Sequence, residues 1–204
     1  MLFIQNHSDT AIIVIHEIYG VDKHISGVCD RLGQEKYDVF CPNLLTNRQT
    51  PFKQSEEPAA YQYFMKNVGF DLAKQQIEAL SRQIRDQYRN CFIVGYSVGA
   101  TTAWLCSQYK ELYNGIVCFY GSRIRDYQKL EPQCPALLFF PKQETGFEVD
   151  ELLQTLTGRN NVNVAKVNAL HGFTDPWSKQ YCKAASEETF AKTLAFMENI
   201  RKVR

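Results

Sequence analysis

The residues with the clearest chemical potential are a serine in a G-x-S-x-G motif, Ser97, and a histidine further along the chain, His171. Residues 91–94, before the motif, form a short apolar run typical of a buried strand, and residues 101–105 continue as a helix. Such a tight turn needs small residues around the serine and leaves its hydroxyl exposed above the sheet. Ser97 is therefore a candidate nucleophile, and the N–H of Val98 is expected to point at an oxyanion forming beside it.

A serine hydroxyl is a weak nucleophile at neutral pH, so it needs an imidazole to accept its proton and a carboxylate to orient that imidazole. His171 follows the last predicted strand, and Glu144 follows the strand before it. The order serine, acid, histidine is that of α/β-hydrolases. We therefore predict a catalytic triad of Ser97, Glu144 and His171. Asp150, in the following helix, and Asp126, after the preceding strand, are alternative positions for the acid.

The elements that must position these groups are strands alternating with helices. Short apolar or β-branched runs predict strands at 10–15, 37–41, 91–94, 113–120, 135–140 and 161–168. Amphipathic spacing predicts helices between them, one of which is expected to be capped by Asp22. This alternation predicts a doubly wound, mostly parallel α/β sheet with helices on both faces, an α/β-hydrolase fold, in one domain spanning 1–204.

Residues 43–69 interrupt this alternation with an aromatic-rich connection that has no strong period. A long connection leaving the carboxyl edge of a sheet is typically functional, so it is either a short lid or pocket-flanking segment, or a surface helix that buries its aromatic residues against the core. The aromatic residues expected to contact a substrate are Tyr19, Tyr63, Phe64, Phe173 and Trp177.

Composition excludes several other classes of protein. A formal net charge of +1 and a pI near 7.6 give no field that would collect nucleic acid. The apolar run at 11–15 is too short for a membrane span or a signal-peptide core, so we expect no membrane association and a cytoplasmic location.

The seven cysteines form an odd set without a C-x-x-C pair. Such spacing is typical of small buried hydrophobic residues in a reducing compartment, and not of a disulfide framework or a zinc site. We therefore expect no metal, and a redox or thiol enzyme is a weak alternative.

Motifs along the chain, taken in order, resemble the dienelactone hydrolase family. They are the H-E-I-Y-G segment at 16–20, the serine motif, Tyr-Gly at 120–121, His-Gly-Phe at 171–173 and the helical T-L-A-F at 193–196. The resemblance covers nearly the whole chain. It implies an α/β-hydrolase fold, hydrolysis of an ester or lactone through an acyl-enzyme, and no metal or cofactor. It also implies that the Ile18 N–H joins that of Val98 in an oxyanion hole and that Glu17 lies beside the nucleophile.

The chain departs from the family pattern at chemically important positions. Ser97 replaces the cysteine of the founding enzymes, so Glu17 either keeps the family's role beside the nucleophile or only braces its loop. Glu144 stands in place of an aspartate. Asp175 stands where the family has an arginine that holds a substrate carboxylate, which predicts a neutral or weakly polar ester or lactone.

The sequence therefore predicts a serine hydrolase with a small-molecule ester or lactone substrate, acting as a monomer or homodimer. Thioesters and acyl-peptides are substrate variants of the same chemistry. The principal alternative is a hydrolase-fold protein that has lost turnover and binds a ligand.

Overall fold

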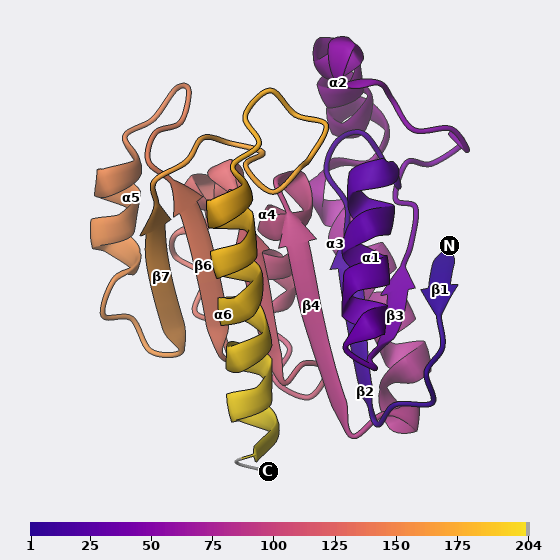
Figure 1. Ribbon diagram of the computed structural model, residues 1–204. Coiled ribbons are helices and arrows are strands. Elements are labelled where there is room, and N and C mark those ends of the chain that lie inside the picture. Colours follow the sequence, from indigo (N-terminus) through magenta and orange to yellow (C-terminus); the bar gives the residue numbers. More distant parts are fainter. Residues whose placement is uncertain (203–204) are drawn as a thin grey trace.

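A mostly parallel sheet forms the centre of the computed structural model, which describes residues 1–202 (Figure 1). Its strand order is β1-β3-β2-β4-β5-β6-β7, and only β1 runs antiparallel to its neighbour. The strands are β1 (Leu2–Ile4), β2 (Thr10–Ile15), β3 (Asp38–Cys41), β4 (Asn90–Tyr96), β5 (Gly115–Phe119), β6 (Ala136–Pro141) and β7 (Val162–Val167). The carboxyl ends of the parallel strands therefore meet at one edge of the sheet.

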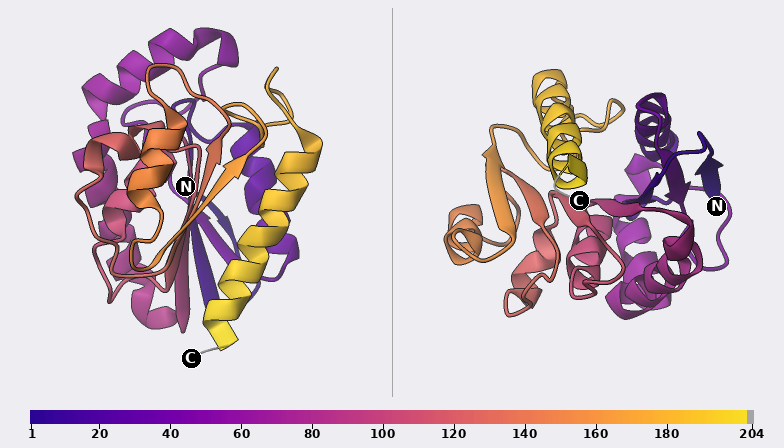
Figure 2. Two further views of the ribbon diagram at one scale, coloured as in Figure 1. Left: turned by 90° about the vertical axis from the view of Figure 1, so that its left-hand side faces the viewer. Right: turned by 90° about the horizontal axis from the view of Figure 1, so that it is seen from below.

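Helices cover both faces of this sheet. The helices are α1 (Lys23–Gln34), α2 (Glu57–Asn67), α3 (Gly69–Ile84), α4 (Val98–Cys106), α5 (Val149–Leu156) and α6 (Lys183–Lys202), with short 3-10 segments at Gln54–Glu56, Arg85–Gln87 and Ser122–Tyr127. Figure 2 shows α1 and α6 on one face and α3, α4 and α5 on the other. The predicted α/β-hydrolase arrangement is confirmed.

The hydrophobic residues form one cluster on each face. Every residue of β2 and β4 is buried, as their apolar runs predict for strands covered on both sides. On one face, α1 and α6 bury Ile25 and Met197 against the sheet. On the opposite face, α3, α4 and α5 bury Ile77, Trp104 and Leu152. The strand β4, which leads into the G-x-S-x-G turn, is therefore covered on both faces, and this packing fixes the position of its last residue.

Two local features at the start of the chain differ in how well the sequence predicts them. The Asp22 side chain accepts a hydrogen bond of 3.0 Å from the Ile25 N–H, which confirms the predicted cap of α1. By contrast, Leu2–Ile4 is a strand that pairs with β3 at the edge of the sheet, where only a brief apolar start was predicted. A segment of three residues is too short for its alternation of apolar and polar residues to predict a strand, or to indicate a pairing strand almost forty residues away.

Candidate active site

The turn after β4 has the geometry that the G-x-S-x-G motif predicts. Ser97 has φ 53° and ψ −112°, a region that non-glycine residues rarely adopt. A Cβ on Gly95 would lie 2.3 Å from the Gly99 carbonyl oxygen, and one on Gly99 would lie 2.3 Å from the Ile15 carbonyl oxygen. Both positions therefore require glycine. The strained backbone at Ser97 is held by its own N–H, which donates to the Phe119 carbonyl at 2.9 Å.

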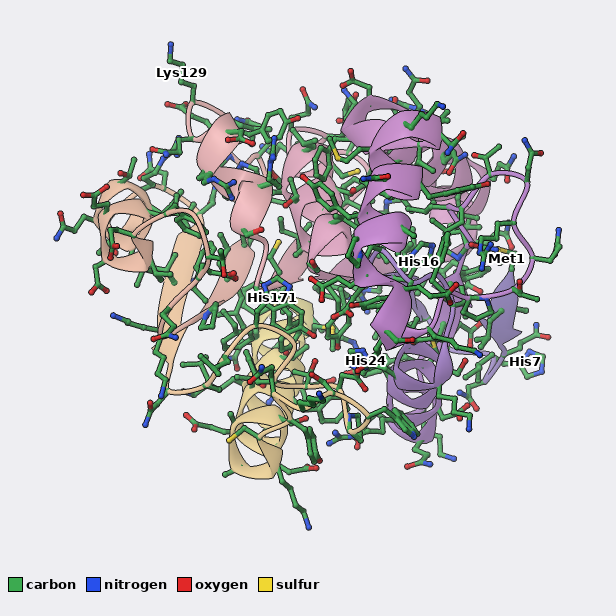
Figure 3. The ribbon with its side chains drawn as sticks, turned by 90° about the horizontal axis from the view of Figure 1, so that it is seen from above. Met1, His7, His16, His24, Lys129 and His171 are labelled. Atoms are coloured by element: carbon green, nitrogen blue, oxygen red, sulfur yellow. The ribbon has the colours of Figure 1, made fainter. Side chains whose placement is uncertain are left out.

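Ser97, His171 and Glu144 form a continuous hydrogen-bonded row. The Ser97 hydroxyl lies 3.1 Å from His171 Nε2, and His171 Nδ1 lies 2.7 Å from a carboxyl oxygen of Glu144. Because a carboxylate can only accept hydrogen bonds, the neutral imidazole carries its proton on Nδ1 and leaves Nε2 free to accept from the serine. Figure 3, seen from the carboxyl-end side of the sheet, shows His171 near the middle of the molecule.

The electrostatic surroundings of His171 suit a general base. Burial alone would lower the pKa of this imidazole, but the hydrogen bond and negative charge of Glu144 outweigh burial and raise the pKa above its ordinary value. The Glu144 side chain is only 7% exposed, so water screens this pair weakly.

The alternative acids lie elsewhere. Asp126 forms an ion pair of 2.6 Å with Arg123 at the surface. Asp150, whose side chain is 66% exposed, pairs with Lys166 at 2.5 Å. Of the predicted acids, Glu144 is the one that the structure brings to His171.

The loops that carry Glu144 and His171 are joined by a backbone hydrogen bond. The Lys142 N–H, just before the acid, donates to the Ala169 carbonyl, just before the histidine, at 2.9 Å. An isolated bridge between Glu144 and Phe147 closes the turn that holds the acid. On the other side, the His171 ring packs at 4.8 Å between centroids against Tyr120, which is fully buried. These contacts hold the imidazole in the plane between serine and carboxylate.

A cavity of about 720 Å³ opens over this row of residues. Ser97, His171 and Glu144 line it, together with Ile18 and Val98. The N–H groups at the start of a helix have no acceptor within the helix, so the Val98 N–H is free for an anion at this wall. The cavity therefore combines a hydroxyl, a base and backbone donors, which is the set of groups that acyl transfer requires.

Comparison with known proteins is consistent with this geometry. A sequence profile of the dienelactone hydrolase family matches residues 2–201. The chain belongs to the dienelactone hydrolase family. An uncharacterized protein of Bacillus subtilis, YczH, is 38% identical over 190 residues, which cover 92% of this chain and 90% of that protein.

More distant relatives carry names from the same family. A putative carboxymethylenebutenolidase of Salmonella typhi is 23% identical over 202 residues, covering 90% of this chain and 74% of the relative. The crystal structure of a putative dienelactone hydrolase from Klebsiella pneumoniae has a TM-score of 0.74 at 18% identity, covering 91% of this chain and 85% of that chain. Family membership confirms the resemblance seen in the sequence motifs, and with it a hydrolase that acts on ester bonds.

Glu17 lies on the wall of the cavity and is almost completely buried, with 6% of the residue exposed. Burial raises the pKa of its carboxyl to about 7, against the lowering effects of the His171 charge and of a hydrogen bond with Tyr120. Its Oε1 has no hydrogen-bond partner among residues 1–202. Glu17 therefore places on the wall of this cavity a carboxyl whose raised pKa lies near neutral pH.

Asp175 also lines the cavity, at the position where the resemblance implies an arginine. Its carboxyl accepts from the Gln54 side-chain amide and, at 2.8 Å, from the Trp177 N–H. Burial raises the pKa of Asp175, and its negative charge in turn raises the pKa of Glu17. Arg123 stands on the wall as well, but it is paired with Asp126.

The aromatic residues predicted to contact a substrate divide into two groups. Tyr19 lines the cavity. The prediction is wrong for Phe64 and Phe173, which are fully buried in the core, where Phe64 packs edge-on against Phe70 at 5.5 Å. Tyr63 donates its hydroxyl to the Thr46 carbonyl in place of facing the cavity, and Trp177 lines a neighbouring hollow.

The segment 43–69 realises both alternatives that its sequence left open. Its 3-10 turn and α2 place Gln54, Glu57 and Tyr61 on the cavity wall, while Phe64, one turn further along the same helix, belongs to the core. Gln54 was not predicted, because nothing in an aperiodic connection indicates which polar residue will reach a site more than a hundred positions away.

The remaining predictions concern groups outside this site. No disulfide joins the cysteines within residues 1–202, and burial raises the pKa of the Cys91 and Cys106 thiols to about 12, which disfavours thiolate chemistry. Across the described range 1–202, no cluster of three or more His, Cys, Asp or Glu residues could hold a metal ion. Within the same residues, every helix is too short or too polar to span a bilayer.

Proposed function

We propose that this protein is a serine hydrolase that cleaves a small carboxylic ester or lactone through an acyl-enzyme. The observation that carries the proposal is the unbroken row of hydrogen bonds from Ser97 through His171 to Glu144. The fixed strand-to-helix turn supports it, because the serine backbone is strained into one orientation before any substrate arrives.

In the first half of the reaction, His171 Nε2 accepts the Ser97 hydroxyl proton as the serine oxygen attacks the substrate carbonyl. The carbonyl oxygen becomes an oxyanion beside the Val98 and Ile18 N–H groups. Collapse of this intermediate breaks the bond to the leaving oxygen, which takes the proton from Nε2. Glu144 stabilises the positive charge that the imidazole carries between these two transfers.

In the second half, a water molecule takes the place of the leaving alcohol. His171 accepts one proton from this water while the water oxygen attacks the acyl carbon. The acid product departs when the bond to Ser97 breaks and Nε2 returns the proton to the serine oxygen. With a lactone, the leaving alcohol and the acyl group are one molecule, so the product is a single hydroxy acid.

The charges around the cavity support a neutral or weakly polar substrate. Asp175 is close enough to Glu17 for its negative charge to raise the pKa of the Glu17 carboxyl, so this wall repels an additional carboxylate. On the cationic side, Arg123 is paired with Asp126 and Arg125 lies 4.8 Å from the Phe147 ring. Tyr19 and Tyr61 add aromatic surface to the same cavity.

The activity is tested by comparing hydrolysis of p-nitrophenyl acetate by the wild type and by Ser97→Ala. The variant should lose at least about 10³-fold in kcat, because only binding and oxyanion contributions remain. Ser122→Ala is the matched control, since Ser122 lines the same cavity without touching His171. Wild-type turnover by Ser97→Ala would contradict the proposal, and absence of turnover by the wild type on a broad ester and thioester panel would favour the ligand-binding alternative.

The substrate class is tested with matched short acyl esters that differ only in a free carboxylate. The neutral members should have a kcat/KM at least about tenfold higher, a difference that a single unfavourable charge pair can supply. In Asp175→Asn the ratio of kcat/KM between neutral and carboxylate-bearing esters should be smaller than in the wild type. A kcat/KM for the carboxylate-bearing esters equal to that of the neutral ones would overturn this part of the proposal.

A further inference from the structure

A second cavity, of about 300 Å³, lies on the α1 and α6 side of the molecule. Its walls come from α1, from the loop that leads to α6, and from the first turns of α6. Aromatic and aliphatic side chains form one part of its wall, from Val28, Tyr96, Phe119, Trp177, Tyr181 and Phe190, and polar side chains that include Asp30, Arg31 and Gln34 form another. Within residues 1–202 it shares no lining residue with the cavity over Ser97, so it is a separate hollow.

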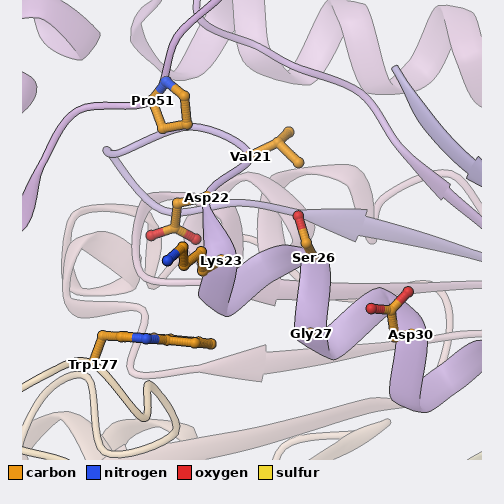
Figure 4. A pocket seen from close by; sticks show the side chains of 8 residues that line it. All are labelled: Val21, Asp22, Lys23, Ser26, Gly27, Asp30, Pro51 and Trp177. Carbon is orange, nitrogen blue, oxygen red and sulfur yellow. The ribbon is translucent and has the colours of Figure 1, made fainter.

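Large apolar side chains stand at the solvent end of this second cavity. Trp177 is 55% exposed and Tyr181 is 36% exposed, although both line it. Figure 4 shows Trp177 extending from its loop toward the start of α1, where it also borders a shallower neighbouring pocket. Aromatic surface left open around a hollow of this size is a feature of ligand-binding sites.

One polar group inside the second cavity lacks a partner. His24 lines it and is only 3% exposed. Its Nε2 lies 3.1 Å from the Thr174 hydroxyl, whereas its Nδ1 has no hydrogen-bond partner among the residues that the structure describes. Burial lowers the pKa of His24 to about 4, so this imidazole is neutral at physiological pH. A buried nitrogen without a partner costs free energy, which a ligand group can recover.

The direction of the neighbouring hydrogen bonds decides what kind of group His24 can accept. Thr174 also contacts the Tyr120 hydroxyl at 2.5 Å, and Tyr120 bonds to the Glu17 carboxyl. When Glu17 is ionised it can only accept, so Tyr120 donates to it and accepts from Thr174, and Thr174 then accepts from His24 Nε2–H. The proton of His24 therefore lies on Nε2, and Nδ1 presents a lone pair.

We propose that this second cavity binds a small aromatic molecule that carries a hydrogen-bond donor, such as a phenol, with the donor on His24 Nδ1 and the ring among Phe119, Phe190 and Trp177. The aromatic and aliphatic side chains supply contact area, and the unpartnered, buried acceptor nitrogen of His24 supplies orientation and selectivity. Binding at this site does not require turnover at Ser97.

The test uses 4-methylphenol and toluene as a matched pair of probes, because they differ by one hydroxyl group. Each is titrated into the full chain at pH ~8, where Glu17 is ionised, and binding is followed by NMR shifts of the His24 imidazole and the Trp177 indole. In the wild type 4-methylphenol should bind about tenfold more tightly than toluene, the effect of one hydrogen bond.

Two variants make the outcome decisive. His24→Phe keeps the ring but removes the acceptor, so the preference for 4-methylphenol should disappear while toluene still binds. Val28→Trp fills the hollow from α1 and should abolish binding of both probes, with ester turnover as the check that the protein is folded. Absence of saturable shifts at Trp177 in the wild type, or unchanged 4-methylphenol affinity in both variants, would overturn the proposal.

Discussion

His171 and His24 have opposite electrostatic surroundings, and they also differ in exposure, since 38% of the His171 side chain but only 3% of His24 is exposed. His171 has a carboxylate 2.7 Å from its Nδ1, and its pKa is raised despite burial. His24 has a hydroxyl on Nε2 and no partner on Nδ1 among residues 1–202, and burial lowers its pKa to about 4. One histidine is therefore prepared to accept a proton at neutral pH, and the other is held neutral.

The difference indicates that a carboxylate partner can outweigh the effect of burial on the pKa of an imidazole, whereas burial without such a partner lowers that pKa. A carboxylate stabilises the protonated ring as it forms, which a general base requires. A hydroxyl gives no such stabilisation, so a buried ring with that partner serves as a fixed acceptor or donor. Removing the carboxylate from His171 should therefore make it resemble His24.

The largest effect is expected from Glu144→Gln. The amide keeps a hydrogen-bonding group near His171 Nδ1 but cannot stabilise the imidazolium, so kcat should fall by roughly 10²-fold or more. The measurement is steady-state hydrolysis of p-nitrophenyl acetate. Asp126→Asn and Asp150→Asn are matched controls whose kcat should stay within a few-fold of wild type. If Glu144→Gln is fully active and one of the two control variants is inactive, the acid of the triad is the residue changed in that control.

A smaller effect is expected on stability through His24. Its pKa is about 4 in the folded protein, against an ordinary histidine value of 6.5, so between these pH values the unfolded chain binds the extra proton and the folded protein does not. Stability is thus lost as pH falls from 6.5 toward 4, by up to about 3 kcal/mol at about 1.4 kcal/mol per pKa unit.

Urea unfolding of His24→Phe across this pH range checks the prediction. The acid-induced fall in the free energy of unfolding should be shallower in the variant by a few kcal/mol. His7→Ala, at an exposed position between β1 and β2, is the control that should keep the wild-type slope. If the free energy of unfolding depends on pH in the same way for His24→Phe and the wild type, His24 takes up its proton in the folded protein as readily as in the unfolded chain, which contradicts the prediction.

The smallest effect is expected in the pH dependence of catalysis. His171 works only as a neutral base, so kcat/KM should fall as pH drops through its pKa, which lies above the ordinary histidine value. In Glu144→Gln the residual activity should extend to lower pH, because burial then acts without the opposing carboxylate. An acid limb at the same pH in both enzymes would mean that Glu144 does not set this pKa.

Much of the hydrogen-bonded row of Ser97, His171 and Glu144 could be predicted from the sequence, because the motifs that indicate it are local. Gly95 and Gly99 are required because a Cβ at either position would lie 2.3 Å from a backbone carbonyl oxygen. For Gly95 this oxygen belongs to Gly99, and for Gly99 it belongs to Ile15 in the neighbouring strand. The order of Ser97, Glu144 and His171 along the chain is enough to place them at the same edge, since parallel strands deliver their loops there. The choice of Glu144 over Asp126 and Asp150 needed the structure, because it depends on which loop bends toward the imidazole.

The rest depends on contacts between distant segments. Phe64 and Tyr61 lie on the same helix, and only its packing decides that Phe64 enters the core while Tyr61 borders the cavity. The contact between His24 and Thr174 joins residues 150 positions apart. No spacing rule links them, so the second cavity could not be predicted from the sequence.

The measurement that tests the central claim most directly is incubation with a fluorophosphonate, followed by intact mass and peptide mapping. An activated serine should be labelled once per chain, on Ser97, and labelling should be lost in Ser97→Ala and strongly slowed in Glu144→Gln. Ser122→Ala should be labelled at the wild-type rate. Absence of an adduct on the wild-type protein, or an adduct that persists in Ser97→Ala, would contradict the account.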